Sequence, residues 1–353
     1  MMDAKELSAR ILCACAVPAF ARWRRSGQLA ILMFHGVESQ PLSPSCDWVI
    51  DTATLRRDLA YVRSRFNVLP LQEALERLGD GSLPRRAATV TFDDGTRNLL
   101  TNAAPVLREL GMPAAVFVAT GPMGTTELLW PDRLWEAFAG TTRTEIDLSA
   151  LGLGIRSLQS EAERIRSRDE TISLLKQLPD DRRVAEVTSV VDALGQGPGP
   201  SGGPFQLLSW EEALELQSGG LVTLYPHSVT HPILSRCDDG KLDREVSESC
   251  RAVEQHTGRA PTIFAYPNGG VDDFDDRTRD ALQRNGITWA LSTANGFAGV
   301  DSDPYALPRM GFSTDQSFAV FKLKISGFSL RPRRFRAAAT QPARSEVPTD
   351  VAV

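Results

Sequence analysis

The sequence of 353 residues has few cysteines and no excess of positive charge. Both features argue against certain classes of function. The five cysteines are scattered without a CxxC spacing, which favours neither a disulfide framework nor a cysteine-ligated zinc site. The formal net charge is −5, so there is no extended basic field for nucleic acid or another polyanion. We therefore predict a reducing compartment and no nucleic-acid partner.

Long hydrophobic runs are also missing. The apolar stretch ILCACAVPAFA (11–21) is too short to span a bilayer. It is similar to the core of a signal peptide, but Asp3 and Glu6 precede it and RWRR (22–25) follows it, as in an amphipathic surface helix. We favour retention in the cytoplasm, with a cleaved leader and export as the alternative. The arginines near both ends leave open a peripheral contact with a membrane.

From Leu29 onward, apolar strand-like runs alternate with segments of helical period. This pattern is typical of βα units around a parallel sheet or barrel. Six runs are expected to form strands, at 29–34, 87–92, 114–120, 221–225, 262–266 and 287–291. One helix is expected over 97–110, ending at Gly111, and another after Ser209, where Glu212 completes a capping box. The count reaches six or seven units and predicts an α/β fold.

Residues 121–205 interrupt this alternation. They are charge-rich and mostly helical in period as far as about 194, and GQGPGPSGGP (195–204) cannot hold a regular element. We therefore predict three segments: an N-terminal helical segment (1–28), a main domain (29–330) with a mainly helical insertion (121–205), and a disordered tail (331–353).

Polar side chains follow several of the predicted strands. They are His35, Asp93 with Asp94, His227 with His231, Asn268 and Arg309. In a barrel of βα units the carboxyl ends of the strands meet at one rim, where active sites assemble. We therefore expect these side chains to lie in one site.

The segment HSVTH (227–231) is the strongest metal signal. Two histidines at positions i and i+4 of a helical turn can present imidazole nitrogens to one metal ion. A pair of surface histidines is the alternative, because HxxxH often arises by chance. The chain has only four histidines, however, and three of them follow predicted strands. One carboxylate from the Asp93–Asp94 pair would complete a two-histidine, one-aspartate set with open positions for water and substrate.

The segment TFDDG (91–95) places two carboxylates side by side. A divalent cation offsets their repulsion and keeps both ionised. One can then ligate the metal while the other accepts a proton from water whose pKa such a cation lowers to about 7. Taken alone, the segment would be better explained as a polar turn with Gly95 at positive φ.

Together these segments resemble a known family. TFDDG (91–95), HSVTH (227–231) and FAYPNG (264–269), in that order, resemble the first three motifs of the polysaccharide deacetylases, the NodB-homology domain of carbohydrate esterase family 4. ILMFHGV (31–37) and LWPDRLWEAF (129–138) are similar to the branch linked to bacterial exopolysaccharide and cell-surface glycan synthesis. The resemblance implies a distorted (β/α) barrel of about seven parallel strands.

Matched by position, the resemblance implies that Asp93 is the general base. It implies that Asp94, His227 and His231 hold a divalent metal, most often Zn²⁺. Water activated by this metal would attack the acetamide carbonyl of an N-acetylated glycan, and acetate and a free amine would leave.

The third motif of the resemblance would form the wall of the substrate groove. Its residues here are Tyr266, Pro267, Asn268 and Gly269. Pro267 and Gly269 would shape the wall, and a backbone N–H near Asn268 would help to stabilise the oxyanion.

Two residues of the family pattern are missing. Ala265 stands where the broad family has an arginine that orients the base, and Arg309 stands where its last motif usually ends in a histidine that protonates the leaving amine. We hypothesise that Arg309 restores the missing guanidinium by pairing with Asp93. We hypothesise that His35 supplies the missing imidazole as the general acid.

Trp130 and Trp135 are candidates for a sugar-stacking platform, although helical aromatic residues more often belong to the core. The sequence as a whole predicts a metal-dependent deacetylase of N-acetylated amino sugars in a polysaccharide or its lipid-linked precursor. One alternative is a deformylase or deacetylase of a single lipid-linked sugar. The other is a glycan-binding or assembly protein that kept the fold and lost turnover.

Overall fold

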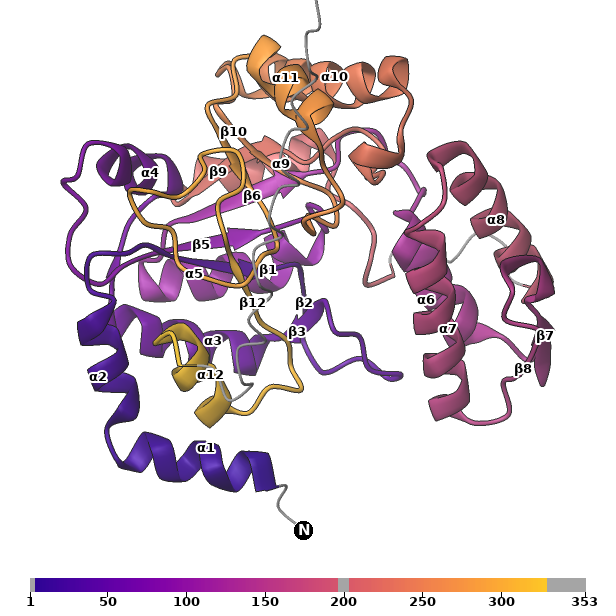
Figure 1. The fold of residues 1–353 in the computed structure, drawn as a ribbon, viewed down its shortest axis with the longest axis horizontal. Coiled ribbons are helices and arrows are strands. Elements are labelled where there is room, and N and C mark those ends of the chain that lie inside the picture. Colours follow the sequence, from indigo (N-terminus) through magenta and orange to yellow (C-terminus); the bar gives the residue numbers. More distant parts are fainter. Residues whose placement is uncertain (1–3, 196–202, 329–353) are drawn as a thin grey trace, which may run out of the picture.

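The protein is described from a computed structural model that covers residues 4–195 and 203–328. Within these residues, seven strands follow one another around a distorted barrel (Figure 1). They are β1 (Ala30–Phe34), β5 (Ala87–Phe92), β6 (Ala114–Val118), β9 (Val222–Pro226), β10 (Ile263–Ala265), β11 (Trp289–Leu291) and β12 (Met310–Gly311). Every ladder between them is parallel. The predicted α/β barrel is therefore confirmed.

The barrel is distorted because its ring is only partly hydrogen-bonded. β12, β1, β5, β6 and β9 form one continuous sheet, whereas β10 and β11 form a separate pair. β10 lies beside β9, and a single parallel bridge between Leu291 and Leu307 leads from β11 toward β12. Each of the six predicted runs overlaps a strand of this ring. They could be recognised because a strand that is buried on both faces has a nearly continuous apolar sequence.

Shorter strands and helices complete the fold around the barrel. The short strands are β2 (Gly36–Glu38), β3 (Val49–Asp51) and β4 (Asn67–Val68). The surrounding helices are α3 (Thr52–Arg65), α4 (Leu71–Gly79), α5 (Ala104–Leu110), α9 (Trp210–Ser218), α10 (Asp239–Thr257), α11 (Asp276–Arg284) and α12 (Phe318–Ile325). The predicted capping box of Ser209 and Glu212 is present at α9. The helix predicted over 97–110 is instead a π-helical turn (Leu99–Ala103) continued by α5, and Gly111 ends it with φ +59°.

The core has two layers because successive residues of each strand point to opposite sides. Leu32 and Phe34 of β1 pack outward into the larger cluster beneath the helices. Ile31 of the same strand packs inward against Phe117 and Tyr225. The inside of the barrel is therefore filled by side chains, and a site can form only at its rim.

Between β6 and β9 the chain forms a helical segment at the right of Figure 1. It contains α6 (Trp130–Gly140), α7 (Glu161–Leu175), α8 (Asp180–Ala193) and an antiparallel hairpin of β7 (Glu145–Asp147) and β8 (Ile155–Ser157). These elements share a hydrophobic cluster of their own, which explains how an insertion can fold beside the barrel. The hairpin was not predicted. Most of the predicted loop 195–204 and the whole predicted tail (331–353) lie outside the described residues. The bounds of the three predicted segments stay predictions.

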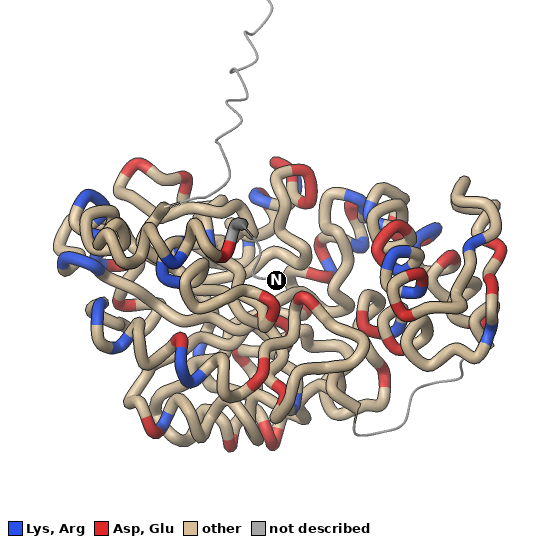
Figure 2. The backbone as a smooth tube through the Cα atoms, turned by 90° about the horizontal axis from the view of Figure 1, so that it is seen from below, with Lys and Arg blue, Asp and Glu red and all other residues tan. Residues whose placement is uncertain are grey.

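Near the N-terminus, two helices pack against α12, the last helix of the described chain. They are α1 (Ala4–Ala14) and α2 (Val17–Arg24), and both contact α12. Among the described residues, no helix has the length and apolar character needed to cross a bilayer. Figure 2 shows acidic and basic positions mixed along the outside of the described backbone.

Candidate metal and catalytic site

The turn after β5 aims two carboxylates at the rim of the barrel. Asp93 and Asp94 follow Phe92 directly, and both are buried. Asp94 has φ +69° and Gly95 has φ +79°, so two successive residues adopt the left-handed region. A Cβ on Gly95 would lie 2.8 Å from Cγ1 of Val118, and glycine is therefore required here both by backbone conformation and by space.

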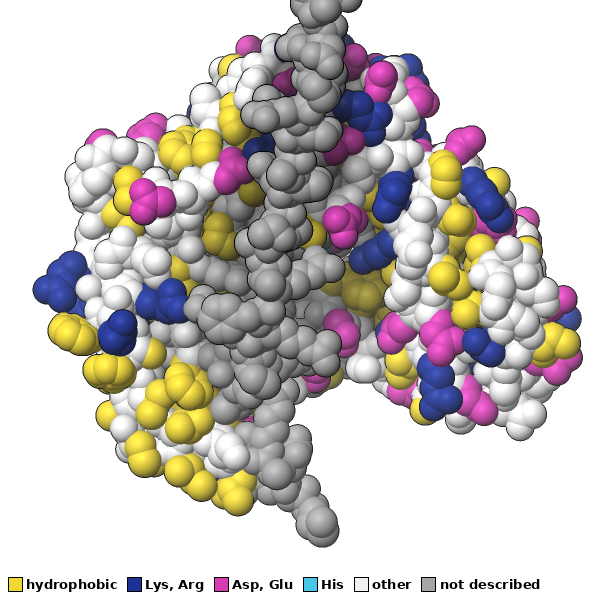
Figure 3. Space-filling view, viewed as in Figure 1, with side chains coloured by type: hydrophobic (Ala, Val, Ile, Leu, Met, Phe, Trp, Pro, Cys, Tyr) yellow, Lys and Arg dark blue, Asp and Glu magenta, His cyan; other side chains and the backbone are white. Residues whose placement is uncertain are grey.

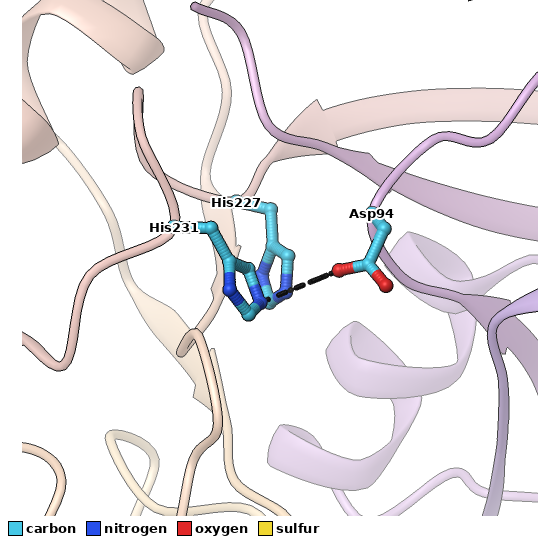
Figure 4. A group of neighbouring side chains, drawn as sticks. All are labelled: Asp94, His227 and His231. Atoms are coloured by element: carbon cyan, nitrogen blue, oxygen red, sulfur yellow. Dashed lines mark ion pairs between the residues drawn. The ribbon is translucent and has the colours of Figure 1, made fainter. Parts of the chain in front are cut away.

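Asp94, His227 and His231 converge on one point at this rim (Figure 4). Oδ1 of Asp94 lies 3.6 Å from Nε2 of His227 and 3.3 Å from Nε2 of His231. Two ligand atoms about 2.1 Å from a tetrahedral ion lie about 3.4 Å from each other. The observed separations therefore match a set of three atoms that share one small cation.

The hydrogen bonding of this group also fits a cation. Oδ1 of Asp94 is buried and accepts no hydrogen bond, although both imidazoles lie close to it. A buried carboxylate oxygen without a donor is costly unless a positive charge compensates it. Nδ1 of His227 lies 2.7 Å from the carbonyl oxygen of Ala265, which fixes the tautomer that leaves Nε2 free as a ligand. Two imidazole nitrogens and one carboxylate oxygen suit Zn²⁺ among other divalent metals.

The protonation states of the three residues follow from their burial. Burial raises the pKa of Asp94 to about 7; the charges of Asp132 and Asp93 add to this effect, and that of His35 opposes it. Burial lowers the pKa of His227. Burial and the neighbouring His227 hold the pKa of His231 well below its usual value. At neutral pH the imidazoles are therefore neutral, which is the form that binds metal.

The two histidines do not lie on a helical turn, contrary to the sequence-based expectation. Residues 227–231 form an irregular loop after β9, in which Ser228 has φ +64° and His231 has φ +58°. The left-handed residues interrupt any helix but still bring both imidazoles to the same side. The metal prediction therefore had the right pair of residues and the wrong local geometry.

Glu245 of α10 holds this loop from behind. Its buried carboxylate accepts hydrogen bonds from the backbone N–H of Val229 (2.8 Å) and of Thr230 (2.8 Å), and from the hydroxyl of Thr230 (2.5 Å). The hydroxyl oxygen of Ser228 accepts the N–H of His231. Sequence reasoning missed Glu245, because nothing in a single helix sequence separates this glutamate from its exposed neighbours.

Arg309 reaches Asp93 through the inside of the barrel. Its two terminal nitrogens each donate to one oxygen of Asp93 at 2.7 Å, and Nε donates to the carbonyl of Ser292. Both side chains are almost fully buried. Burial alone would raise the pKa of Asp93, but the charge and hydrogen bonds of Arg309 lower it to about 2. The predicted pairing is present, although Arg309 precedes β12 and does not directly follow a strand.

The remaining predicted residues divide into two groups. His35 is half-buried after β1, close enough for its charge to affect the pKa of Asp93 and of Asp94. Asn268 has φ +60°, and its buried Nδ2 lacks a hydrogen-bond partner. Tyr266 is fully buried and donates its hydroxyl to the carbonyl of Tyr305, so its side chain is part of the core and not of the groove wall that was predicted.

Pro267 and Gly269 lie on either side of Asn268 in a tight turn. The N–H of Gly269 donates to the carbonyl of Pro267 at 2.7 Å. A Cβ on Gly269 would lie 3.0 Å from the carbonyl oxygen of Tyr266. The third motif therefore contributes a closely packed backbone turn, and Asn268 is its one residue with a free polar group.

Helix α6 brings Trp130 and Asp132 toward the site, and its Trp135 packs elsewhere. Nε1 of Trp130 donates to the carbonyl of His231 at 3.2 Å. Asp132 is buried and accepts a hydrogen bond from Nε1 of Trp48; burial raises its pKa to about 7. Trp135 donates to the carbonyl of Ser45. Both α6 tryptophans are buried, so neither offers an open stacking platform.

Comparisons with known proteins agree with this fold. The family model described as polysaccharide deacetylase matches residues 80–290, more than half of the chain. No curated protein is a significant match. The structure is similar to the Streptococcus pyogenes deacetylase PplD in complex with acetate, with TM-score 0.56 and 14% identity over 84% of this chain and 98% of that chain.

Two further solved structures are similar over most of their length. One is IcaB from Ammonifex degensii, with TM-score 0.54 and 18% identity over 85% of this chain and 97% of that chain. The other is a de-N-acetylase from Aggregatibacter actinomycetemcomitans, with TM-score 0.54 and 14% identity over 84% of this chain and 99% of that chain. At these identities the likeness shows a shared fold.

Proposed function

Because the chain belongs to the polysaccharide deacetylase family, we propose that it is a metal-dependent hydrolase that removes the N-acetyl group of amino sugars. Its substrate is a polysaccharide or the lipid-linked precursor of one. The observation that carries the proposal is the buried Oδ1 of Asp94, which accepts no hydrogen bond and faces Nε2 of His227 and of His231 at 3.6 and 3.3 Å. When bound there, a divalent cation, in our proposal Zn²⁺, polarises the acetamide carbonyl and lowers the pKa of water.

Asp93 is the proposed general base, and Arg309 positions it. The bidentate pair fixes the plane of the carboxylate, and each oxygen keeps a lone pair for a proton from the attacking water. With a pKa of about 2, Asp93 is a weak base toward ordinary water. Proton transfer to it is efficient only when the water itself has been made more acidic.

His35 is the proposed general acid for the leaving amine. It follows β1 at the same rim, and its charge influences the pKa of both Asp93 and Asp94. An imidazolium there would donate a proton to the nitrogen as the amide bond breaks. The unpartnered Nδ2 of Asn268 is proposed to donate to the substrate from the opposite wall.

Acetate release and metal content measured together test this proposal. Wild type, Asp93→Asn and Asp94→Asn are compared on N-acetylglucosamine oligomers and on purified surface glycan from the source organism. We expect wild type to bind metal and release acetate. Asp93→Asn should keep the metal and lose activity by about 10²–10⁴-fold, and Asp94→Asn should lose both metal and activity.

Each alternative function gives a different result in the same experiment. If the protein bound metal but released acetate from no glycan, the result would favour a glycan-binding protein over an enzyme. If the mass of the product showed loss of a formyl group in place of an acetyl group, the protein would be a deformylase and not a deacetylase. For the acid, His35→Gln should remove the basic limb of the pH–rate profile, and an unchanged limb would exclude His35 from that role.

A further inference from the structure

Helices α1 and α2 carry apolar side chains on two sides. One side packs against the rest of the protein, and the other is exposed. Ala9 and Leu12 face α12, where they join Ala319 and Leu323 in a small cluster. The outer surface carries Leu7, Ile11, Phe20 and Trp23, which we call the outer face; their exposed fractions are 47, 54, 60 and 63%. In Figure 3, hydrophobic side chains gather over these two helices at the lower left.

The outer face is a concentration of exposed apolar side chains and not a random scatter. Its four residues are half of the eight large hydrophobic side chains that are exposed in the described part of the chain. Leu7 and Ile11 are four residues apart on α1, and Phe20 and Trp23 are three residues apart on α2, so each pair shares one side of its helix. The rings of Phe20 and Trp23 have centroids 6.0 Å apart. Single exposed apolar residues need no explanation, but a contiguous group marks a contact surface.

Positive charge accompanies this face. Residues 4–25 contain five basic residues and one acidic residue, in a chain whose net charge is −5. Arg24 follows Trp23 and is exposed, and the exposed Arg10 pairs with Glu6, whereas Arg22 turns toward the protein and donates to the hydroxyl of Tyr61. Aromatic and aliphatic side chains next to arginines on a surface helix are typical of a helix that lies in a membrane interface.

The charge also argues against a second copy of this chain as the occupant. In a symmetric dimer the same patch lies on both sides of the interface. The arginines of one outer face would then approach those of the other, and burial would make their repulsion more costly. An anionic lipid surface attracts the same charges, by about 1 kcal/mol for each Lys or Arg near the surface.

We propose that the outer face of α1 and α2 docks the protein onto an anionic lipid bilayer. Leu7, Ile11, Phe20 and Trp23 enter the interfacial region, and the exposed Arg10 and Arg24 contact lipid phosphates. The helices lie along the membrane plane and do not cross it. This docking is independent of the proposed reaction, because none of its residues belongs to the metal and catalytic site.

Vesicle sedimentation of the full chain tests the docking. The probes are vesicles of phosphatidylcholine alone and of phosphatidylcholine with phosphatidylglycerol, at low and at high salt. We expect binding to the anionic vesicles that weakens with salt. The double variant Phe20→Ser/Trp23→Ser should bind roughly tenfold to a hundredfold more weakly, because two large apolar side chains no longer leave water.

The matched control is Val271→Ser/Val300→Ser, which removes two equally exposed apolar residues (68 and 70%) far along the sequence. It should bind anionic vesicles as well as wild type does, and acetate release from a soluble oligomer should be unchanged in both double variants. Absence of vesicle binding by wild type, or equal binding by the Phe20/Trp23 variant, overturns the proposal. Wild type could instead form a dimer in sedimentation velocity and fail to bind vesicles. If the Phe20/Trp23 variant were then monomeric, the outer face would be assigned to contact with a second copy.

Discussion

Arg309 and Asp93 form an ion pair inside the barrel, where the two charges depend on each other. The carboxylate is ionised because the guanidinium donates to both of its oxygens, and its pKa is lowered to about 2 despite burial. A buried pair of this kind adds little net stability compared with apolar residues, but removal of one partner is costly. The pair is better explained by the orientation of Asp93 than by stability.

Removal of Arg309 should separate these two effects. In Arg309→Met, Asp93 stays buried without its partner, and we expect a loss of about 3–5 kcal/mol in the free energy of unfolding. The double variant Asp93→Asn/Arg309→Met should regain most of that stability without regaining activity, while both variants keep the metal. Denaturant unfolding, metal analysis and acetate release measure the three quantities.

The control is Arg284→Met, which removes an exposed arginine that pairs with the exposed Asp243. Exposed pairs contribute about 0–1 kcal/mol, so its unfolding free energy should change little. If Arg309→Met were as stable and as active as wild type, Arg309 would have no positioning role.

Proton competition at Asp94 should set the pH dependence of metal binding. Burial raises the pKa of its carboxyl to about 7 in the metal-free protein, whereas the pKa values of His227 and His231 are lowered. Below pH 7 the cation must therefore displace one proton, from Asp94. The logarithm of the apparent binding constant should rise by about one per pH unit between pH 5.5 and 6.5 and then level off, as measured by competition with a chromophoric chelator. A slope near two would mean that the histidines are protonated instead.

The sequence predicts the identity of these residues better than their geometry. His227, His231 and one carboxylate of the aspartate pair could be recognised because histidines and aspartates follow strand-like runs. The choice of Asp94 as the ligand, and of Arg309 to replace the guanidinium missing at Ala265, came from the family resemblance. The positive φ angles of Ser228 and His231 could not be predicted, since a spacing of four residues suits a helix and this loop equally. Tyr266 was assigned to the groove because it is next to Pro267, but its ring packs on Phe274 in the core.

At the scale of elements, the metal-binding loop depends on α10. Its backbone donors at Val229 and Thr230 bond to the carboxylate of Glu245. Its other backbone hydrogen bonds join His227, Ser228 and Val229 to the end of β6 and the residues after it. A loop with two left-handed residues keeps this conformation only when its surroundings fix it. Glu245 is therefore a positioning residue for both histidines.

Glu245→Gln should weaken metal binding without removing a ligand. The amide keeps the size of the side chain, but its NH2 group replaces the oxygen that accepts the hydroxyl proton of Thr230. The backbone N–H groups of Val229 and Thr230 then face a neutral oxygen in place of a carboxylate, which makes a weaker hydrogen bond. We expect about a 10–100-fold loss of metal affinity, the usual cost of changing a residue that orients metal ligands. The same chelator competition measures it.

Glu254→Gln is the matched control, because Glu254 is an exposed glutamate on the same helix. Its metal affinity should equal that of wild type. Equal affinity in Glu245→Gln as well would show that the loop keeps its shape without the carboxylate.

Elements differ in how well the sequence predicts them. β5 was predicted at its observed bounds because six apolar or small residues lie between the basic turn before it and the aspartates after it. The β7–β8 hairpin was missed because each strand has three residues and only Ile146 is buried in β7. Short strands are specified by their partners more than by their own residues.

At the scale of the whole molecule, the helical segment between β6 and β9 is connected to the metal-binding loop. The guanidinium of Arg183 in α8 lies 4.9 Å from the centre of the Trp130 ring. Asp180 of the same helix pairs with both Arg183 and Lys241, and Lys241 belongs to α10. Helix α10 thus contacts the loop through Glu245 and the helical segment through Lys241. This arrangement could not be predicted, because nothing in the sequence separates Asp180, Arg183 and Lys241 from the other charged residues of the same helices.

Trp130→Phe tests whether this connection acts on the metal site. The change keeps an aromatic ring over Arg183 but removes the N–H that bonds to the carbonyl of His231. Loss of one neutral hydrogen bond, about 1 kcal/mol, should weaken metal binding about fivefold. Trp135→Phe makes the same change at a similarly buried tryptophan of α6, whose N–H bonds to Ser45 away from the metal. It should lower only the unfolding free energy, and equal metal affinities in the two variants would mean that the helical segment does not act on the metal site.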